Sequence, residues 1–471
     1  MRIPQLLIVI VVPLVAISHA QRPSQFYALV GARVHLAPGR VIDNGVIVLR
    51  DGLLEQVGLD LTPPPGARVI DGKGLVAYPG FIDGGAQFGL RPPDHTPEQD
   101  DPLNRQEDAQ VAMRVAWRRG LRPELRAAQW LTVDDNWRRH RQAGFTTALI
   151  EPTGGLLNGQ SALINLNGEA KRTSLIRAGT FQHVTLAPLG GFGAAGGYPS
   201  TLMGALTHAR QFLLDAQWHR NLQAAFERKP TGRRPPVDEA LESVFPALDG
   251  EESVVFRAES ESDIRRALKF ADEFHLKAII AGGTEAWKLA NELKRRGVPV
   301  IVGLNFGVEP GATPPPPTAS SRPPRDDLGF EIPEAPARWR QEQKRVYDEK
   351  LANAGKLRAA GVVIALTTAG LPSMNEFTSN LQKAIKAGLK HDDALAALTV
   401  SPAKLFGQAQ LGELRAGAIG NVTVLTVALD AAGVRTKYLF IDGKLFEPEK
   451  ESPPPTPPIG IARPGEDGDR R

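Results

Sequence analysis

The chain has 471 residues, 42% hydrophobic and 23% charged, with a formal net charge of +4, so it is long enough for a large core and a smaller second domain. No cluster of basic and aromatic residues accompanies this small charge, and the densest basic run, residues 138–141, is interpreted as a solvated helix face, so we expect no nucleic-acid partner. The chain contains no cysteine, which excludes disulfides, thiol nucleophiles and cysteine-ligated metals.

The N-terminal segment 1–20 has the pattern of an export signal. Arg2 supplies a positive start, residues 6–17 form an apolar core, and Ser-His-Ala at 18–20 is a small-x-small cleavage site. The apolar core is too short for a stable membrane span, with a retained N-terminal anchor as the alternative. We therefore expect an exported protein, periplasmic or secreted, whose mature chain begins near Gln21.

Short β-like runs separated by turns follow the signal. They cover residues 28–36, 46–50, 53–57 and 68–71. Asp51-Gly52, between the second and third runs, predicts a β-hairpin.

The next stretch, residues 78–90, reads Tyr-Pro-Gly-Phe-Ile-Asp-Gly-Gly-Ala-Gln-Phe-Gly-Leu. A short strand, 81–83, ends abruptly in a run of small residues. Such an ending leaves bare backbone at the strand end, as a site at the mouth of a barrel would need.

Strand-like and helix-like runs then alternate as far as residue 387. The expected strands are 146–151, 162–167, 254–258, 278–281, 299–304 and 362–367. The expected helices are 133–143, 202–228, 262–274, 285–296, 337–359 and 375–387. This alternation predicts parallel βα units and favours an α/β fold with a closed or distorted (β/α)8 barrel. Fewer than eight strands are clear, so segments 177–188 and 198–215 are the places for a missing one.

Proline-rich and glycine-rich stretches interrupt the pattern. Residues 309–327 predict a mobile loop over one barrel face, and residues 452–471 predict a disordered tail. The glycine-rich segments 154–161 and 190–193 lack a strand-GxGxxG-helix frame, so they are interpreted as flexible loops near the barrel mouth. Strand character returns at 420–429 and 438–445, with a turn at Asp442-Gly443.

Three sets of motifs resemble the amidohydrolase superfamily, and most closely its imidazolonepropionase-like members. Residues 79–83 match the Pro-Gly-Phe-Ile-Asp of its first barrel strand. The N-terminal runs at 45–58 and 69–74 resemble one half of its small β-sandwich, and 398–407 with 411–417 resemble its C-terminal pattern. The resemblance implies a distorted TIM (β/α)8 barrel plus a β-sandwich built from both chain ends.

The resemblance also implies domain boundaries. A signal peptide at 1–20 precedes the N-terminal part of the sandwich at 21–78 and the barrel at 79–410. The C-terminal part of the sandwich, 411–448, is followed by a disordered Pro-rich tail at 449–471.

Proteins of this family use one or two divalent metals to hydrolyse amide, lactam and related C–N bonds, so the resemblance implies zinc or another divalent metal. The residues here depart from the family's ligand pattern, because an arginine cannot ligate and glycine has no side chain. The ligand positions on strands one, five, six and eight hold, in chain order, Gly85 and Gln87, Arg257, Gly282 or Gly283, and Thr368. We therefore predict no metal and no other cofactor.

The remaining histidines do not rebuild a metal site, because no pair has HxH or HExxH spacing. His95 and His183 lie in loops that could overhang the pocket. The other mature histidines are expected at surface or packing positions: His35, His140, His208, His219, His275 and His391.

Five residues are the candidates for lining the pocket at the strand ends: Asp83, Gln87, Glu151, Arg257 and Thr368. In the simpler interpretation Arg257 pairs with Asp83 or Glu151 and fills the space of the lost metal. In the alternative, its guanidinium binds an anionic ligand, since the fork recognises carboxylate and phosphate.

These observations predict a pseudoenzyme on an amidohydrolase scaffold. No Gly-x-Ser-x-Gly elbow supports a serine hydrolase. Two alternatives remain open: a module that binds a small-molecule or anionic ligand in the old pocket, and an interaction subunit that forms a homo-oligomer or pairs with an active homologue.

Overall fold

The structure is a computed structural model that describes residues 25–91, 120–169, 171–189, 199–310 and 336–448. Several predicted features lie outside these ranges: the export signal, His95, the glycine-rich segment 190–193, all but the first two residues of loop 309–327, and the tail from residue 449. Among the described helices, none is both long enough and apolar enough to cross a membrane.

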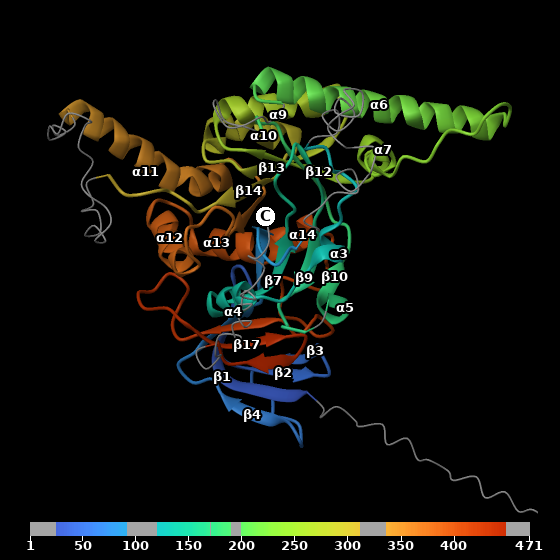
Figure 1. Cartoon of the computed structure of the whole chain (residues 1–471). Coiled ribbons are helices and arrows are strands. Elements are labelled where there is room, and N and C mark those ends of the chain that lie inside the picture. The colour runs from blue at the N-terminus through green and yellow to red at the C-terminus, as the bar shows by residue number, and fades with distance from the viewer. Residues whose placement is uncertain (1–24, 92–119, 170, 190–198, 311–335, 449–471) are drawn as a thin grey trace, which may run out of the picture.

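Strands from both ends of the chain share one eight-stranded sheet, which forms one end of the molecule (Figure 1). Its strands are β1 (Phe26–Ala37), β2 (Arg40–Arg50), β3 (Leu53–Gly58), β4 (Arg68–Asp71), β5 (Val76–Pro79), β16 (Val422–Leu425), β17 (Thr436–Ile441) and β18 (Lys444–Phe446). The hydrogen-bonded order is β18-β17-β16-β5-β1-β2-β3, with β4 paired to β1. Antiparallel pairing of β16 with β5 joins the two chain ends. The predicted turns at Asp51-Gly52 and Asp442-Gly443 are both present, with positive φ at all four residues.

Two further sheets carry the central part of the chain. Their strands are β6 (Phe81–Ala86), β7 (Phe145–Ile150), β8 (Leu157–Gln160), β9 (Ala162–Asn165), β10 (Leu175–Arg177), β11 (Gln182–Thr185), β12 (Ser253–Ala258), β13 (Lys277–Gly282), β14 (Val300–Gly303) and β15 (Ile364–Thr367). One sheet has the order β10-β9-β7-β6 and the other β15-β14-β13-β12-β11-β8. The run from β11 to β15 is parallel throughout, and β6 pairs parallel with β7. The predicted α/β class is therefore confirmed, whereas the ladders between described strands do not close into a barrel.

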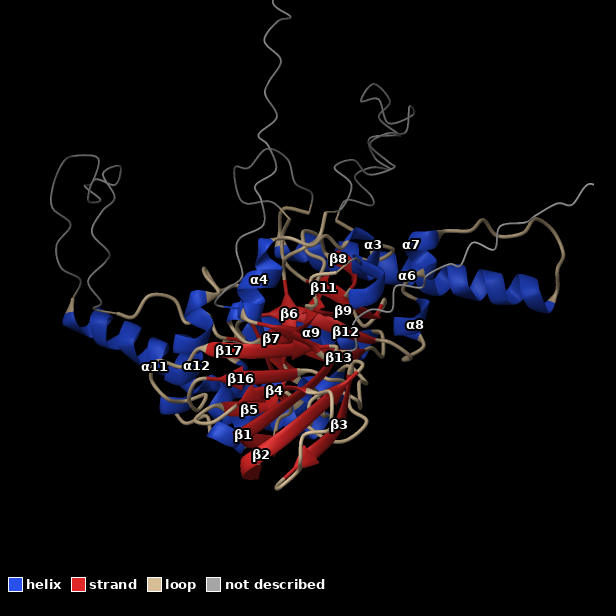
Figure 2. Ribbon diagram, turned by 90° about the horizontal axis from the view of Figure 1, so that it is seen from below, coloured by secondary structure: helices blue, strands red, loops and turns tan. Residues whose placement is uncertain are grey.

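Helices cover these two sheets, and two of them extend beyond the sheets to opposite sides (Figure 2). Their bounds are α3 (Ala127–Trp130), α4 (Asp135–Gln142), α5 (Lys171–Ser174), α6 (Leu202–Arg228), α7 (Glu239–Glu242), α8 (Phe245–Leu248), α9 (Glu261–Glu273), η2 (Ala286–Leu289), α10 (Ala290–Arg296), α11 (Ala337–Ala359), α12 (Asn375–Lys386), α13 (His391–Leu398) and α14 (Val400–Leu405). The extending helices are α6 and α11, whose predicted ranges agree with the structure residue for residue. Local sequence explains α9 well: Ser260 and Asp263 form a capping box, and Ile264 and Leu268 bury one face.

The prediction of a flexible loop was wrong for part of the glycine-rich segment 154–161. Residues Leu157–Gln160 form β8, which pairs antiparallel with β11. Gly159 has φ of +98°, and a Cβ there would overlap the backbone of Leu125, so this glycine permits close chain packing. Of the two segments expected to hold a missing strand, 177–188 contains β11, whereas the described part of 198–215 begins α6 instead.

The prediction of a solvated basic helix face was also wrong in part. His140 and Arg141 of α4 are buried, and Arg141 Nη1 donates a hydrogen bond to Leu166 O at 3.0 Å. Arg139 keeps the predicted exposed position and pairs with Asp135. The basic composition of residues 138–141 alone does not show this burial, because the helix directs two of the four side chains, His140 and Arg141, toward the protein interior.

Buried polar contacts join β6 to β15, the facing edges of the two sheets. Asp83 is fully buried, and it accepts hydrogen bonds from Thr368 N at 3.1 Å and from Thr368 Oγ1 at 2.5 Å. Thr367 Oγ1 donates to Gly85 O. His140 Nε2 lies 3.2 Å from Thr368 Oγ1 and 3.5 Å from Asp83 Oδ2, and so packs beneath this seam.

We expect Thr368→Val to lower the free energy of unfolding by about 1–3 kcal/mol, because it removes the Thr368 hydroxyl that donates a hydrogen bond to the buried Asp83 carboxylate. Thr368→Ser is the matched control, since it keeps the hydroxyl and should cost less than half as much. Urea unfolding of both variants measures the difference. Equal destabilisation by the two variants would contradict a role for this hydrogen bond.

Candidate functional site

The carboxyl ends of the parallel strands bring together side chains that are far apart in the sequence. Gln87 follows β6, Glu151 follows β7, and Arg257 lies near the end of β12. His183 lies on β11, where it is paired with Val255 of β12. This is the edge of a parallel sheet at which ligands usually bind.

Glu151 and Arg257 form the central ion pair of this edge. Arg257 Nη2 donates to Glu151 Oε2 at 2.5 Å, and Gln87 Nε2 donates to the same oxygen at 3.3 Å. Glu151 is only 2% exposed, whereas the arginine side chain keeps 28% of its surface. Burial raises the pKa of Glu151, and the neighbouring Arg257 and the hydrogen bond from Gln87 offset part of that effect. The simpler of the two predicted roles for Arg257, pairing with a strand-end carboxylate, is therefore present.

The carboxylate of Glu151 occupies space that Gly85 leaves open. A Cβ atom at position 85 would overlap Glu151 Oε1. Position 85 is where the family resemblance expects a metal-binding histidine. In this conformation a histidine at 85 and the Glu151 side chain exclude each other.

The same exchange occurs at the expected strand-six position. A Cβ atom on Gly282 would overlap the carboxylate of Glu259, and Gly282 has φ of +92°, which disfavours any side chain. Glu259 Oε2 accepts a hydrogen bond from Thr284 Oγ1 at 2.5 Å. Gly85 is an expected histidine position, and Gly282 is one of the two alternatives, Gly282 or Gly283, for the strand-six position. In this conformation a glutamate from a neighbouring strand end fills the space beside Gly85 and beside Gly282.

His183 is buried beside this group and stays neutral. Burial, with a smaller contribution from the charge of Arg257, lowers the pKa of His183 to about 3. Its Nε2 has no hydrogen-bond partner among the described residues. The predicted overhang of His183 above a pocket is wrong, because the residue lies within β11 and does not line the cavity at the ends of β6 and β7.

A cavity of about 240 Å³ opens at the ends of β6 and β7. Gln87 and Glu151 line it, together with Arg122 and Asn158. Apolar side chains supply most of its remaining wall: Phe88, Leu90, Leu125, Ala127, Trp130 and Leu157. The cavity thus combines an apolar wall with a few polar groups, which is typical of a small-molecule site.

Two of the five predicted pocket residues line this cavity, Gln87 and Glu151. Asp83 and Thr368 are buried in the seam between the sheets, and Arg257 reaches the cavity only through its partner Glu151. Sequence reasoning missed Arg122 and Trp130, because residues 120–132 show no clear helix or strand period. A basic and an aromatic residue in an unassigned segment were the only available signal.

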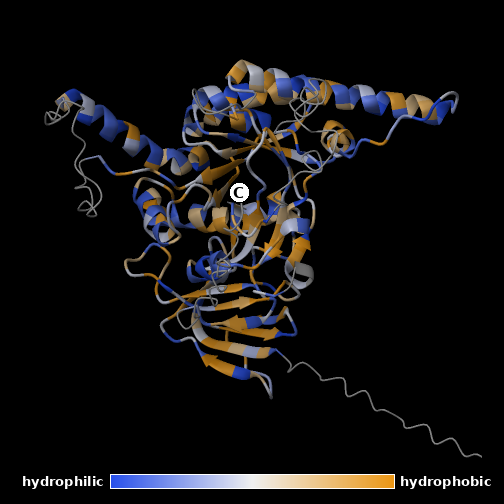
Figure 3. Ribbon diagram, viewed as in Figure 1, coloured by the Kyte–Doolittle hydropathy of each residue, from blue (hydrophilic) through white to orange (hydrophobic). Residues whose placement is uncertain are grey.

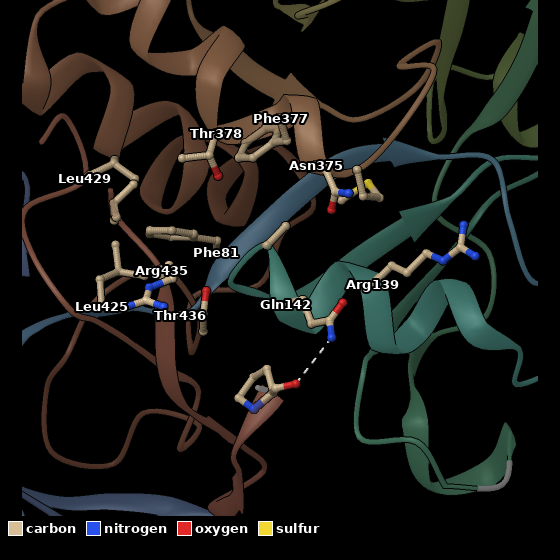
Figure 4. A pocket seen from close by; sticks show the side chains of 14 residues that line it. Phe81, Arg139, Gln142, Asn375, Phe377, Thr378, Leu425, Leu429, Arg435 and Thr436 are labelled. Carbon is tan, nitrogen blue, oxygen red and sulfur yellow. Dashed lines mark hydrogen bonds between the residues drawn. The ribbon is translucent and has the colours of Figure 1, made fainter. Parts of the chain in front are cut away.

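A second cavity, of about 320 Å³, lies at the opposite end of β6 (Figure 4). Phe81, Phe377 and Leu429 contribute apolar walls from β6, from α12 and from the segment after β16. Gln142 donates a hydrogen bond to Pro448 O across its edge. None of the five predicted pocket residues lines this second cavity.

The residues at the expected ligand positions do not fit the divalent metal that the family resemblance implies. Arg257 presents a cation where a metal-binding histidine is expected, and Glu151 fills the space above Gly85. Within the part of the chain that the structure describes, no three histidine, cysteine, aspartate or glutamate residues form a group that could hold a metal ion.

Comparisons with known proteins agree with the motifs. The model of the amidohydrolase family matches residues 338–446. An amidohydrolase from Thermotoga maritima MSB8 has a similar structure, with a TM-score of 0.69 and 20% identity over 89% of this chain and 100% of that chain. A molinate hydrolase has a TM-score of 0.51 and 14% identity over 95% and 99% of the two chains. A prolidase complexed with N-methylphosphonate-L-proline has a TM-score of 0.50 and 16% identity over 90% and 99%.

A search of curated protein sequences found no match. The family match over residues 338–446 and the shared fold agree with the resemblance to the amidohydrolase superfamily that the motifs predicted. The finer similarity to imidazolonepropionase-like members stays a prediction.

We expect Arg257→Met to lower the free energy of unfolding by about 3 kcal/mol, because it leaves the buried Glu151 carboxylate without its counter-ion. The double variant Arg257→Met with Glu151→Leu should recover most of that loss, since it removes the buried charge as well. Chemical denaturation of the wild type, both single variants and the double variant measures the coupling. Additive losses would contradict a direct ion pair.

Proposed function

We propose that this chain is an amidohydrolase-superfamily protein whose strand-end cavity binds a small ligand and does not perform metal-dependent hydrolysis. The observation that carries this proposal is the Glu151–Arg257 pair. Glu151 fills the space beside Gly85 where a metal-binding histidine is expected, and Arg257 supplies a positive charge in place of the metal. In this pair the guanidinium of Arg257 neutralises the buried carboxylate of Glu151.

The ligand that suits the cavity carries an anionic group and a compact apolar part. Arg122 lines the cavity and forms no ion pair with a described residue, so its guanidinium can receive a carboxylate or phosphate. Arg257 uses one of its five N–H donors on Glu151 and stays partly exposed, so it adds positive potential. The apolar wall formed by Phe88, Leu90 and Leu125 would cover the rest of the ligand.

We also propose the finer architecture that the family resemblance implies. The two central sheets would be the parts of a distorted (β/α)8 barrel, and the eight-stranded sheet would belong to a small β-sandwich domain. The polar seam between Asp83 and Thr368 supports this arrangement, because it holds β6 beside β15 where a barrel would close. Export remains a proposal that rests on the sequence of residues 1–20.

The ligand proposal is tested by thermal-shift screening and calorimetry of the full chain against small carboxylates and phosphates. We expect binders to raise the melting temperature, and Arg122→Gln to weaken their affinity by about tenfold or more through loss of a charge-assisted contact. Arg126→Gln is the matched control, because Arg126 is an exposed arginine nearby that does not line the cavity.

Equal affinities for the two variants, or no stabilising anion, would contradict the proposal. Co-purification with an active homologue would instead support the alternative of an interaction subunit, provided that substitutions of cavity residues leave the association unchanged.

A further inference from the structure

The C-terminal part of α6 and the loop after it form an arm, defined here as residues 221–238, that projects from the body of the protein (Figure 1). The last buried residue of α6 is His219. From Asn221 onward no residue is buried until Ala240, at the start of the next packed segment. The last eight of the 27 residues of α6 thus bury no side chain, so their helical conformation depends on local helix propensity or on a partner.

The arm has an excess of positive charge at its tip. Its four cations are all exposed: Arg228, Lys229, Arg233 and Arg234. Glu227 is the one acidic residue between Asn221 and Val237. None of the four cations forms an ion pair with a residue that the structure describes.

Large apolar side chains accompany these charges. Leu214, Trp218 and Leu222 recur every four residues on α6 and so share one face, and Trp218 is 65% exposed. Val237, at the end of the loop, is 77% exposed. Hydrophobic and hydrophilic residues are therefore interspersed along the C-terminal part of α6 (Figure 3).

We propose that the arm, together with the adjacent exposed face of α6 that carries Leu214 and Trp218, docks on an anionic phospholipid surface. Exposed tryptophan and leucine beside arginine and lysine are the combination that inserts at the boundary between head groups and acyl chains. Each basic residue near such a surface adds attraction to the acidic lipids. Charge complementarity favours this occupant over a second copy of the chain, because two arms side by side would bring their cations together.

Flotation with lipid vesicles tests this proposal on the full chain. We expect binding to vesicles that contain phosphatidylglycerol, weaker binding at raised salt, and no binding to phosphatidylcholine alone. Reversing the four arm cations to glutamate should lower partitioning by about tenfold or more. The wild type should also show a blue shift of tryptophan emission on binding, which Trp218→Ser should reduce.

The matched control reverses four exposed cations outside the arm, so that the change in net charge is the same: Arg68, Lys294, Arg295 and Lys390. This control should retain most of the binding. Equal losses in both reversal variants, or no flotation of the wild type, would overturn the proposal. A dimer in light scattering that Trp218→Ser converts to monomer would also overturn it and assign the surface to a second copy.

Discussion

The buried ion pair between Glu151 and Arg257 governs the strand-end site. A carboxylate that is almost fully buried needs a cation close by, and the guanidinium supplies it at 2.5 Å. Gln87 Nε2 donates a second hydrogen bond to the same oxygen, Glu151 Oε2. In the proposed function the pair takes the room of a metal and its ligands, and the Glu151 side chain of the pair lines the cavity.

The position of Glu151 in this pair depends on the absence of a side chain at residue 85. Gly85 makes room for Glu151, and Gly282 makes room for Glu259, so each glycine is matched by a carboxylate from a neighbouring strand end. Restoring one histidine alone would therefore also require the carboxylate end of the facing glutamate to move. The departures from the family pattern are in this sense one rearrangement of the site.

Much of the fold could be predicted from sequence, because long periodic segments decide helix and strand locally. The ranges of α6 and α11 and the Asp51-Gly52 turn follow from such signals. Contacts between distant segments could not be predicted. β8 is recognisable only through its partner β11, His140 only through Thr368, and Arg122 only through the cavity that it lines. In each case tertiary packing overrides local composition.

The central claim is that an ion pair has replaced the metal centre. Elemental analysis of the purified protein tests this claim most directly, because the full chain also contains the residues outside the described ranges. The account predicts substoichiometric zinc, manganese and iron, and no hydrolysis of N-acyl or lactam substrates after metal addition. One equivalent of bound metal together with metal-dependent hydrolysis would contradict it.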